Sequence, residues 1–149
     1  MKKVIVIVII MLVLIFCISF GVVDSSSMSP SYEKDDIVLI CKKCSIERND
    51  CVFIWRNDTL NMKRVIGVGG DTIEMKGCIL YVNNTQITKD YTEYNHQVKY
   101  SKLVIHKDWK IVVPQNKVFI LGDNRDFSED SRIYGCIPIT SIYGRTLRN

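Results

Sequence analysis

The feature that most constrains this chain is an uninterrupted apolar run near its N-terminus, "VIVIVIIMLVLIFCISFGVV" at residues 4–23. The run contains no charged residue and only one serine. About 20 such residues suffice to cross the ~30 Å hydrocarbon core of a bilayer as a helix. Lys2 and Lys3 precede the run, and basic residues favour the cytoplasmic side of a membrane. The sequence therefore predicts a cytoplasmic N-terminus at 1–3, a transmembrane anchor at 4–23 and an extracytoplasmic domain at 24–149.

A cleaved targeting segment is the alternative interpretation of the same run. Such a segment has an apolar part of about 7–15 residues, followed by a cleavage site of the small-x-small type. The run here is longer, and Ser19 and Gly21 would make a poor cleavage site. Its length favours a retained anchor.

The charge of the remaining chain excludes one class of partner. Residues 24–149 carry 18 Lys plus Arg and 16 Asp plus Glu, a net charge of +2. The basic residues are scattered, which argues against a nucleic-acid-binding surface. A domain of this length can bury a core without a structural metal or a disulfide framework.

The cysteines suggest a redox or metal site that the rest of the sequence does not support. Cys17 lies in the apolar run, and an odd number remain outside it: Cys41, Cys44, Cys51, Cys78 and Cys136. "CKKC" has the spacing of a redox or zinc site, but it has neither a second matched pair nor a βαβ pattern around it. The pattern favours small apolar strand residues with room for one disulfide, whose pairing stays open.

Short apolar stretches separated by turns indicate an all-β domain. Residues 37–41, 51–55 and 117–121 are predicted strands, and "TIEMKGCILYV" is typical of a hairpin around Lys76 and Gly77. Asn83 and Asn84 form the next expected turn, and residues 86–110 give no clear assignment. No repeat or long amphipathic helix interrupts this pattern.

A lysine in the stretch "NMKRVIGVGGD" stands where a strand is expected to enter the core. Lys63 is either the polar edge of an ordinary strand, with its ammonium in water, or a buried amine. Burying a charged ammonium is strongly unfavourable, so a buried Lys63 would have a lowered pKa and could be neutral. A lysine of ordinary pKa is neutral in only about one molecule in 2,500 at pH 7.

Three patches together resemble the type I signal peptidases, membrane-anchored proteases of the serine–lysine kind. They are "SMSP" after the anchor, "KRVIGVGGD", and "GDNRDFSEDSR", of which the last is the most specific. The resemblance covers nearly the whole chain in the right order. It implies an all-β catalytic domain with antiparallel, partly barrel-like sheets, which cleaves signal peptides from exported preproteins on the outer face of the plasma membrane.

The resemblance also implies roles for individual residues. Ser27, rather than its neighbours Ser25 and Ser26, matches the nucleophile, and Lys63 matches the general base. Ser128 matches the residue that orients the lysine amine, and the Ser25 hydroxyl matches an oxyanion-hole donor beside the Ser27 backbone N–H. Met28 is expected to pack under the substrate site. Four charged residues match structural ion pairs: Arg64, Asp123, Asp130 and Arg132.

Several positions depart from the family pattern without removing a catalytic group: Ser31, Asp35, Asn49, Gly69, Phe127 and Tyr134. Asp35 and Asn49 replace glycines, and Phe127 replaces a common asparagine beside Ser128. The short span from Asp71 to Gly122 limits any second β subdomain to a small one.

No cofactor or metal is expected, because His96 and His106 lie outside the matched patches and are predicted surface residues. Two further functions stay open at this point. One is a catalytically silent, membrane-tethered β domain that binds exported chains. The other is a CxxC thiol oxidoreductase. The sequence leaves open which preproteins are cleaved and the oligomeric state.

Overall fold

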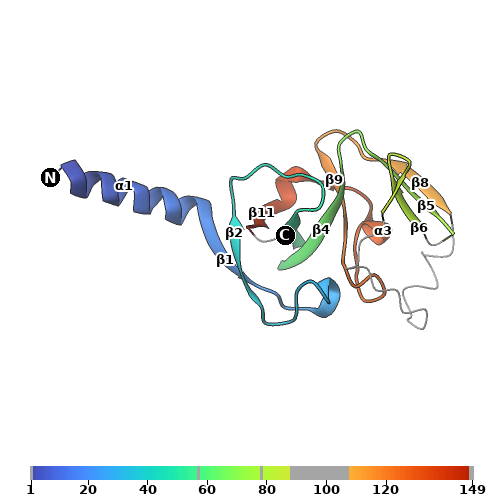
Figure 1. The fold of residues 1–149 in the computed structure, drawn as a ribbon, viewed down its shortest axis with the longest axis horizontal. Helices are drawn as coiled ribbons and strands as arrows, with labels where there is room; N and C mark the ends of the chain where they lie inside the picture. Colours follow the sequence, from blue (N-terminus) through green and yellow to red (C-terminus); the bar gives the residue numbers. More distant parts are fainter. Residues whose placement is uncertain (1, 57, 78, 88–107, 148–149) are drawn as a thin grey trace.

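The computed structural model describes residues 2–56, 58–77, 79–87 and 108–147. Predictions for Cys78, His96 and His106 fall outside these residues. A helix, α1 (Lys2–Cys17), extends away from a β-rich body, and a small sheet lies at the opposite end of the molecule (Figure 1). The described part of the chain is built from antiparallel sheets, which confirms the predicted all-β class.

In the part of the chain that the structure describes, the main sheet has seven strands in the order β1-β2-β11-β3-β4-β9-β10. Their bounds are β1 Ile18–Val22, β2 Ile37–Cys41, β3 Cys51–Arg56, β4 Thr59–Val68, β9 Lys117–Leu121, β10 Ile137–Pro138 and β11 Ile142–Thr146. Short helical turns join them at η1 (Ser26–Met28), α3 (Ser131–Tyr134) and η2 (Ile139–Ser141). Strands β1 and β10 lie at the two edges of this sheet and are not paired with each other. The sheet is therefore open, and the predicted partly barrel-like arrangement does not close into a barrel.

The apolar run at 4–23 does not form one continuous helix, and the anchor predicted over these residues stays a prediction. Helix α1 ends at Cys17, and the last five residues of the run form β1, which pairs with β2 from Ile18↔Cys41 to Val22↔Ile37. Apolar composition alone suits both a buried helix and a strand, and pairing with β2 decides between them. Within the described residues, no helix combines the length and apolar composition needed to cross a bilayer.

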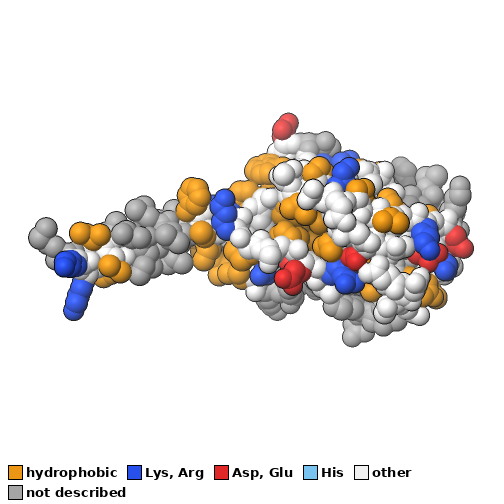
Figure 2. Space-filling view, turned by 90° about the horizontal axis from the view of Figure 1, so that it is seen from above, with side chains coloured by type: hydrophobic (Ala, Val, Ile, Leu, Met, Phe, Trp, Pro, Cys, Tyr) orange, Lys and Arg blue, Asp and Glu red, His pale blue; other side chains and the backbone are white. Residues whose placement is uncertain are grey.

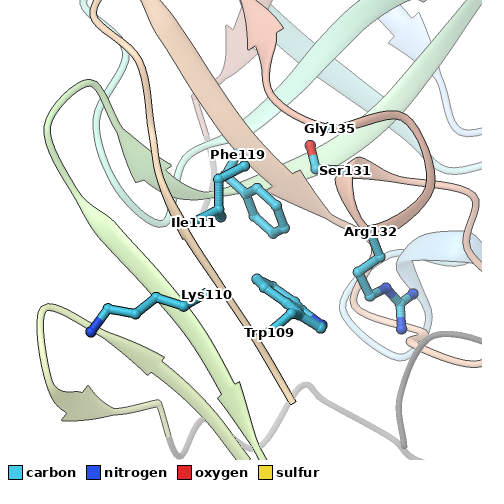
Figure 3. Close-up of a pocket in the computed structure, with 7 residues that line it drawn as sticks. All are labelled: Trp109, Lys110, Ile111, Phe119, Ser131, Arg132 and Gly135. Carbon is cyan, nitrogen blue, oxygen red and sulfur yellow. The ribbon is translucent and has the colours of Figure 1, made fainter. Parts of the chain in front are cut away.

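The second sheet is small, as the short span before Gly122 predicts. Its described residues form four strands in the order β7-β6-β5-β8, namely β5 (Thr72–Lys76), β6 (Ile79–Val82), β7 (Thr85–Gln86) and β8 (Trp109–Val112). Figure 3 shows how it meets the main sheet: Trp109 of β8 packs against Phe119 of β9, with ring centroids 5.5 Å apart, and both rings line a cavity of about 320 Å³. This apolar junction holds the two sheets together.

Strand β4 lies in the middle of the main sheet between β3 and β9. Six consecutive residues, from Met62 to Gly67, are buried, so both faces of the strand are covered. Met62 packs with Val23 and Phe53 on one side, while Val65 packs with Val52 and Ile120 on the other. Any side chain on this part of β4 is therefore held in the interior.

Candidate active site

Lys63 is buried, which decides between the two interpretations of its sequence context. Its side chain projects from the covered part of β4, and the residue is only 4% exposed. Burial lowers the pKa of the Lys63 amine below its ordinary value, although the carboxylates of Asp130 and Asp24 act in the opposite direction. The strand-edge alternative, with the ammonium in water, is wrong.

The amine of Lys63 lies against the hydroxyl of Ser27. Its Nζ donates a hydrogen bond to Ser27 Oγ over 2.8 Å and another to the Met62 carbonyl over 2.9 Å. Ser27 is in the single-turn helix η1 and is 5% exposed, whereas the neighbouring Ser26 is exposed. When the amine is deprotonated, its lone pair can receive the serine proton across the same short contact.

Ser25 also reaches this pair. Its hydroxyl lies 3.1 Å from Ser27 Oγ, so the two hydroxyls are hydrogen-bonded. Of the three adjacent serines, Ser27 is the one whose hydroxyl touches the lysine amine. Met28 is fully buried and packs in the core cluster beneath this segment with Val23 and Tyr32.

The hydrogen bond expected from Ser128 to Lys63 is not formed. Ser128 is 2% exposed, and its hydroxyl has no hydrogen-bond partner among the described residues. The amine instead uses Ser27 and the Met62 carbonyl. Ser128 nevertheless packs beside Gly122, which also lies against the Ser27 carbonyl. Its role as an orienting residue stays a prediction.

The four charged residues predicted to pair do so. Arg64 donates to Asp123 through Nη2 at 2.7 Å and Nε at 2.9 Å, and both side chains are almost fully buried. Arg132 pairs with Asp130 through Nε at 2.8 Å and Nη2 at 2.9 Å. The first pair joins β4 to the loop after β9. The second closes that loop on itself, because Asp130 also accepts from the Gly122 backbone N–H at 3.0 Å.

Two residues of the "GDNRD" loop have site roles that sequence reasoning did not assign. Asn124 donates its backbone N–H to the Ser27 carbonyl at 3.0 Å and its side-chain amide to the Ser26 carbonyl at 3.2 Å. At Gly122, a β-carbon would overlap the Ser128 side chain and lie 2.5 Å from the Ser27 carbonyl oxygen. The sequence could have indicated these two roles, because Gly122 and Asn124 both stand next to Asp123, which was assigned a role in the same motif.

The described residues contain no cluster of His, Cys, Asp and Glu that could hold a metal ion. A hydroxyl and a buried amine at hydrogen-bond distance, on an all-β frame, are typical of serine hydrolases that use lysine as the base. The fold and the site together resemble that class.

Comparison with known proteins places the chain more narrowly. The family described as signal peptidase, peptidase S26, matches residues 1–148. The chain therefore belongs to the signal peptidase family, and this confirms both the resemblance seen in the sequence and the class of enzyme, a signal peptidase I-like serine endopeptidase.

Individual relatives agree with this assignment. Signal peptidase I U of Bacillus subtilis is 34% identical over 117 residues, which cover 74% of this chain and 63% of the relative. Signal peptidase I of Bacillus caldolyticus is 33% identical over 142 residues, which cover 88% of this chain and 78% of the relative. A crystal structure of a signal peptidase I from Enterococcus faecalis superimposes with a TM-score of 0.56 at 28% identity, covering 68% of this chain and 97% of that one.

Proposed function

We propose that this chain removes signal peptides from exported preproteins, with Ser27 as nucleophile and Lys63 as general base. The single observation that carries the proposal is the 2.8 Å contact between Lys63 Nζ and Ser27 Oγ at a buried site. A serine hydroxyl is a weak nucleophile until a base accepts its proton. A lysine whose pKa is lowered by burial can do so near neutral pH without a histidine.

The reaction follows from these positions. Ser27 Oγ attacks the scissile carbonyl while Lys63 takes its proton, and the ammonium then protonates the leaving amine as the peptide bond breaks. This leaves an ester between Ser27 and the signal peptide. Lys63, neutral again, removes a proton from water, which attacks the ester and releases the enzyme. The Ser25 hydroxyl and the Ser27 backbone N–H would stabilise the oxyanion, each worth roughly 3–4 kcal/mol in the transition state.

The substrate class comes from the relatives named signal peptidase. We expect the preprotein to bind as an extended strand beside the strands of the enzyme, with small side chains at the first and third positions before the cut. The polar support around the site would keep its geometry. Arg64–Asp123 fixes β4 against the loop, and Asn124 fixes the loop against η1.

We also propose that α1 anchors the chain in the plasma membrane, with residues 1–3 inside and the domain from residue 24 on the outer face. Support comes from the uncharged apolar sequence after Lys2 and Lys3. The fourteen uncharged helical residues that follow Lys3 span about 21 Å, which is less than the ~30 Å core of a bilayer. The exposed apolar side chains of Phe20 and Val22 in β1 follow directly after the helix.

Cleavage of a preprotein bearing an Ala-x-Ala site tests the proposal. Ser27→Ala and Lys63→Met are expected to lower kcat/KM by at least about 10³-fold, whereas the matched control Ser26→Ala should retain activity because that hydroxyl is exposed. Activity should rise with pH through an apparent pKa below 10.5, the ordinary value for lysine. Full cleavage by Ser27→Ala would remove Ser27 from the mechanism.

The same variants separate the other candidate functions. A silent binding domain would hold the preprotein equally well with Ser27 or alanine at this position, and neither form would cleave it. A thiol oxidoreductase would lose its activity in the Cys41→Ser/Cys44→Ser variant. The peptidase, in contrast, needs neither sulfur for its chemistry.

A further inference from the structure

A groove of about 540 Å³ lies where α1 meets the main sheet, away from the serine–lysine pair. Three aromatic rings line it: Phe16 from the last turn of α1, Trp55 from β3 and Tyr143 from β11. Trp55 is 56% exposed and lies edge-on to Tyr143, with ring centroids 6.3 Å apart. Figure 2 shows hydrophobic side chains gathered where the helix joins the body, with basic side chains among them.

Two lysines give the groove its charge. The Nζ of Lys42 lies 5.8 Å from the centre of the Tyr143 ring, and that of Lys43 lies 5.7 Å from the centre of the Phe16 ring. No described residue that lines the groove is acidic. Neither ammonium makes an ion pair or a hydrogen bond with any described residue, so both remain available to an anion.

The "CKKC" motif holds these lysines in place. A disulfide between Cys41 and Cys44 closes the turn that contains them. The backbone N–H of Lys42 also donates to the Cys17 carbonyl at 2.8 Å, which ties this turn to the C-terminal end of α1. The motif has no part in the proposed peptide cleavage, and its effect is to fix two cations at the end of the apolar helix.

We propose that this groove binds the phosphate headgroup of an anionic phospholipid. The inference rests on the proposed anchor, because α1 must lie in the bilayer for the groove to reach headgroup depth. Tryptophan and tyrosine favour that depth, and lysines near an anionic lipid surface attract it. The first hairpin supplies further apolar surface, since Phe20 faces Leu39 and Val22 faces Ile37 across β1 and β2, all four exposed.

Trp55 can report directly on the lipid beside it. The chain has two tryptophans, so Trp109→Phe in the full-length protein leaves Trp55 as the only indole. The protein is reconstituted into phosphatidylcholine vesicles that contain a minor fraction of brominated lipid, either phosphatidylglycerol or phosphatidylcholine. Each lysine near an anionic surface raises affinity roughly fivefold. Brominated phosphatidylglycerol should therefore quench Trp55 fluorescence at least about threefold more strongly than the same fraction of brominated phosphatidylcholine.

Charge-matched variants locate the effect. Lys42→Gln/Lys43→Gln should bring the quenching ratio to about one. Lys76→Gln/Lys110→Gln removes the same charge from exposed lysines that pair with Glu74 on the small sheet, and it should leave the ratio unchanged. Equal loss in both double variants would show a general charge effect and overturn the site.

Two accompanying measurements distinguish this inference from the proposed function. A chain that fails to float with the vesicles overturns both the anchor and the headgroup site. A chain that floats but is quenched equally by the two brominated lipids overturns the headgroup site alone. Selective quenching with no preprotein cleavage supports the headgroup site and counts against the proposed peptidase activity.

Discussion

Replacing Lys63 by methionine measures how much the buried amine lowers the free energy of unfolding. Methionine keeps most of the volume of the lysine side chain and packs well against the apolar neighbours of β4, but it has no titrating group. The unfolded chain holds the lysine proton up to the ordinary pKa of 10.5, whereas the folded chain releases it at a lower pH because the amine is buried. The variant has no such difference between its two states.

The sign and size of the effect follow from proton linkage. Between the lowered and the ordinary pKa, the unfolded state of the wild type binds one more proton than the folded state. The free energy of unfolding of the wild type therefore rises with pH in that window, by up to about 1.4 kcal/mol per pH unit. The stability advantage of Lys63→Met is largest below the lowered pKa and shrinks at that rate as the pH approaches 10.5.

Urea unfolding followed by circular dichroism, on the full chain from pH 6 to 10.5, measures this difference. Burial also raises the pKa of Cys51 to about 12 and that of Tyr32 in the same direction, but both groups are present in both proteins, so their effect cancels. The pH at which the two stability curves begin to converge should equal the apparent pKa of kcat/KM for the wild type. Parallel curves would refute the reasoning, because they would mean that Lys63 keeps its ordinary pKa.

Three other substitutions probe the support around the site. Gly122→Ala should lower stability by about 1–3 kcal/mol through overpacking against Ser128 and reduce kcat/KM at least tenfold; unchanged thermal unfolding would contradict the crowding. Asp123→Asn should destabilise the chain by about 3–5 kcal/mol, because it removes the buried carboxylate that pairs with Arg64, and Arg64→Met/Asp123→Leu should recover much of that loss in the same unfolding assay. Asp35→Gly should stabilise by about 0.5–1 kcal/mol, since relief of the left-handed conformation at φ 72° outweighs the added chain entropy; a lower melting temperature would count against this.

Much of the sheet could be predicted because its strands carry local signals. The stretches "IVLIC" and "KVFIL" are strands β2 and β9 with the predicted bounds, and β5 and β6 form the hairpin predicted around Gly77. Asn83 and Asn84, the predicted turn, both have positive φ. Asp35 and Asn49, the residues that replace family glycines, also have positive φ, so the backbone keeps the glycine conformation although the residue has changed.

Other elements depend on partners that a linear pattern does not show. The strand β1 continues an apolar run that also suits a helix, and its identity comes from pairing with β2. The four-residue helix α3 lies in a charged loop without apolar periodicity, and Asp130 begins it by accepting from the Arg132 backbone N–H. At the site, the sequence motifs predicted the Ser27–Lys63 contact, but the hydrogen-bonding state of Ser128 depends on side-chain packing around Gly122.

The pairing of β1 with β2 has a geometric consequence for an anchored protease. Each of its five residues is matched to a partner in β2, so α1 runs directly into a strand of about 17 Å that belongs to the main sheet, with no loose tether between them. With α1 held in the bilayer, the reactive hydroxyl sits at a set height above the lipid. If α1 is the anchor, as proposed, the distance of the scissile bond from the membrane would help to select the bond that is cut, in addition to the local sequence.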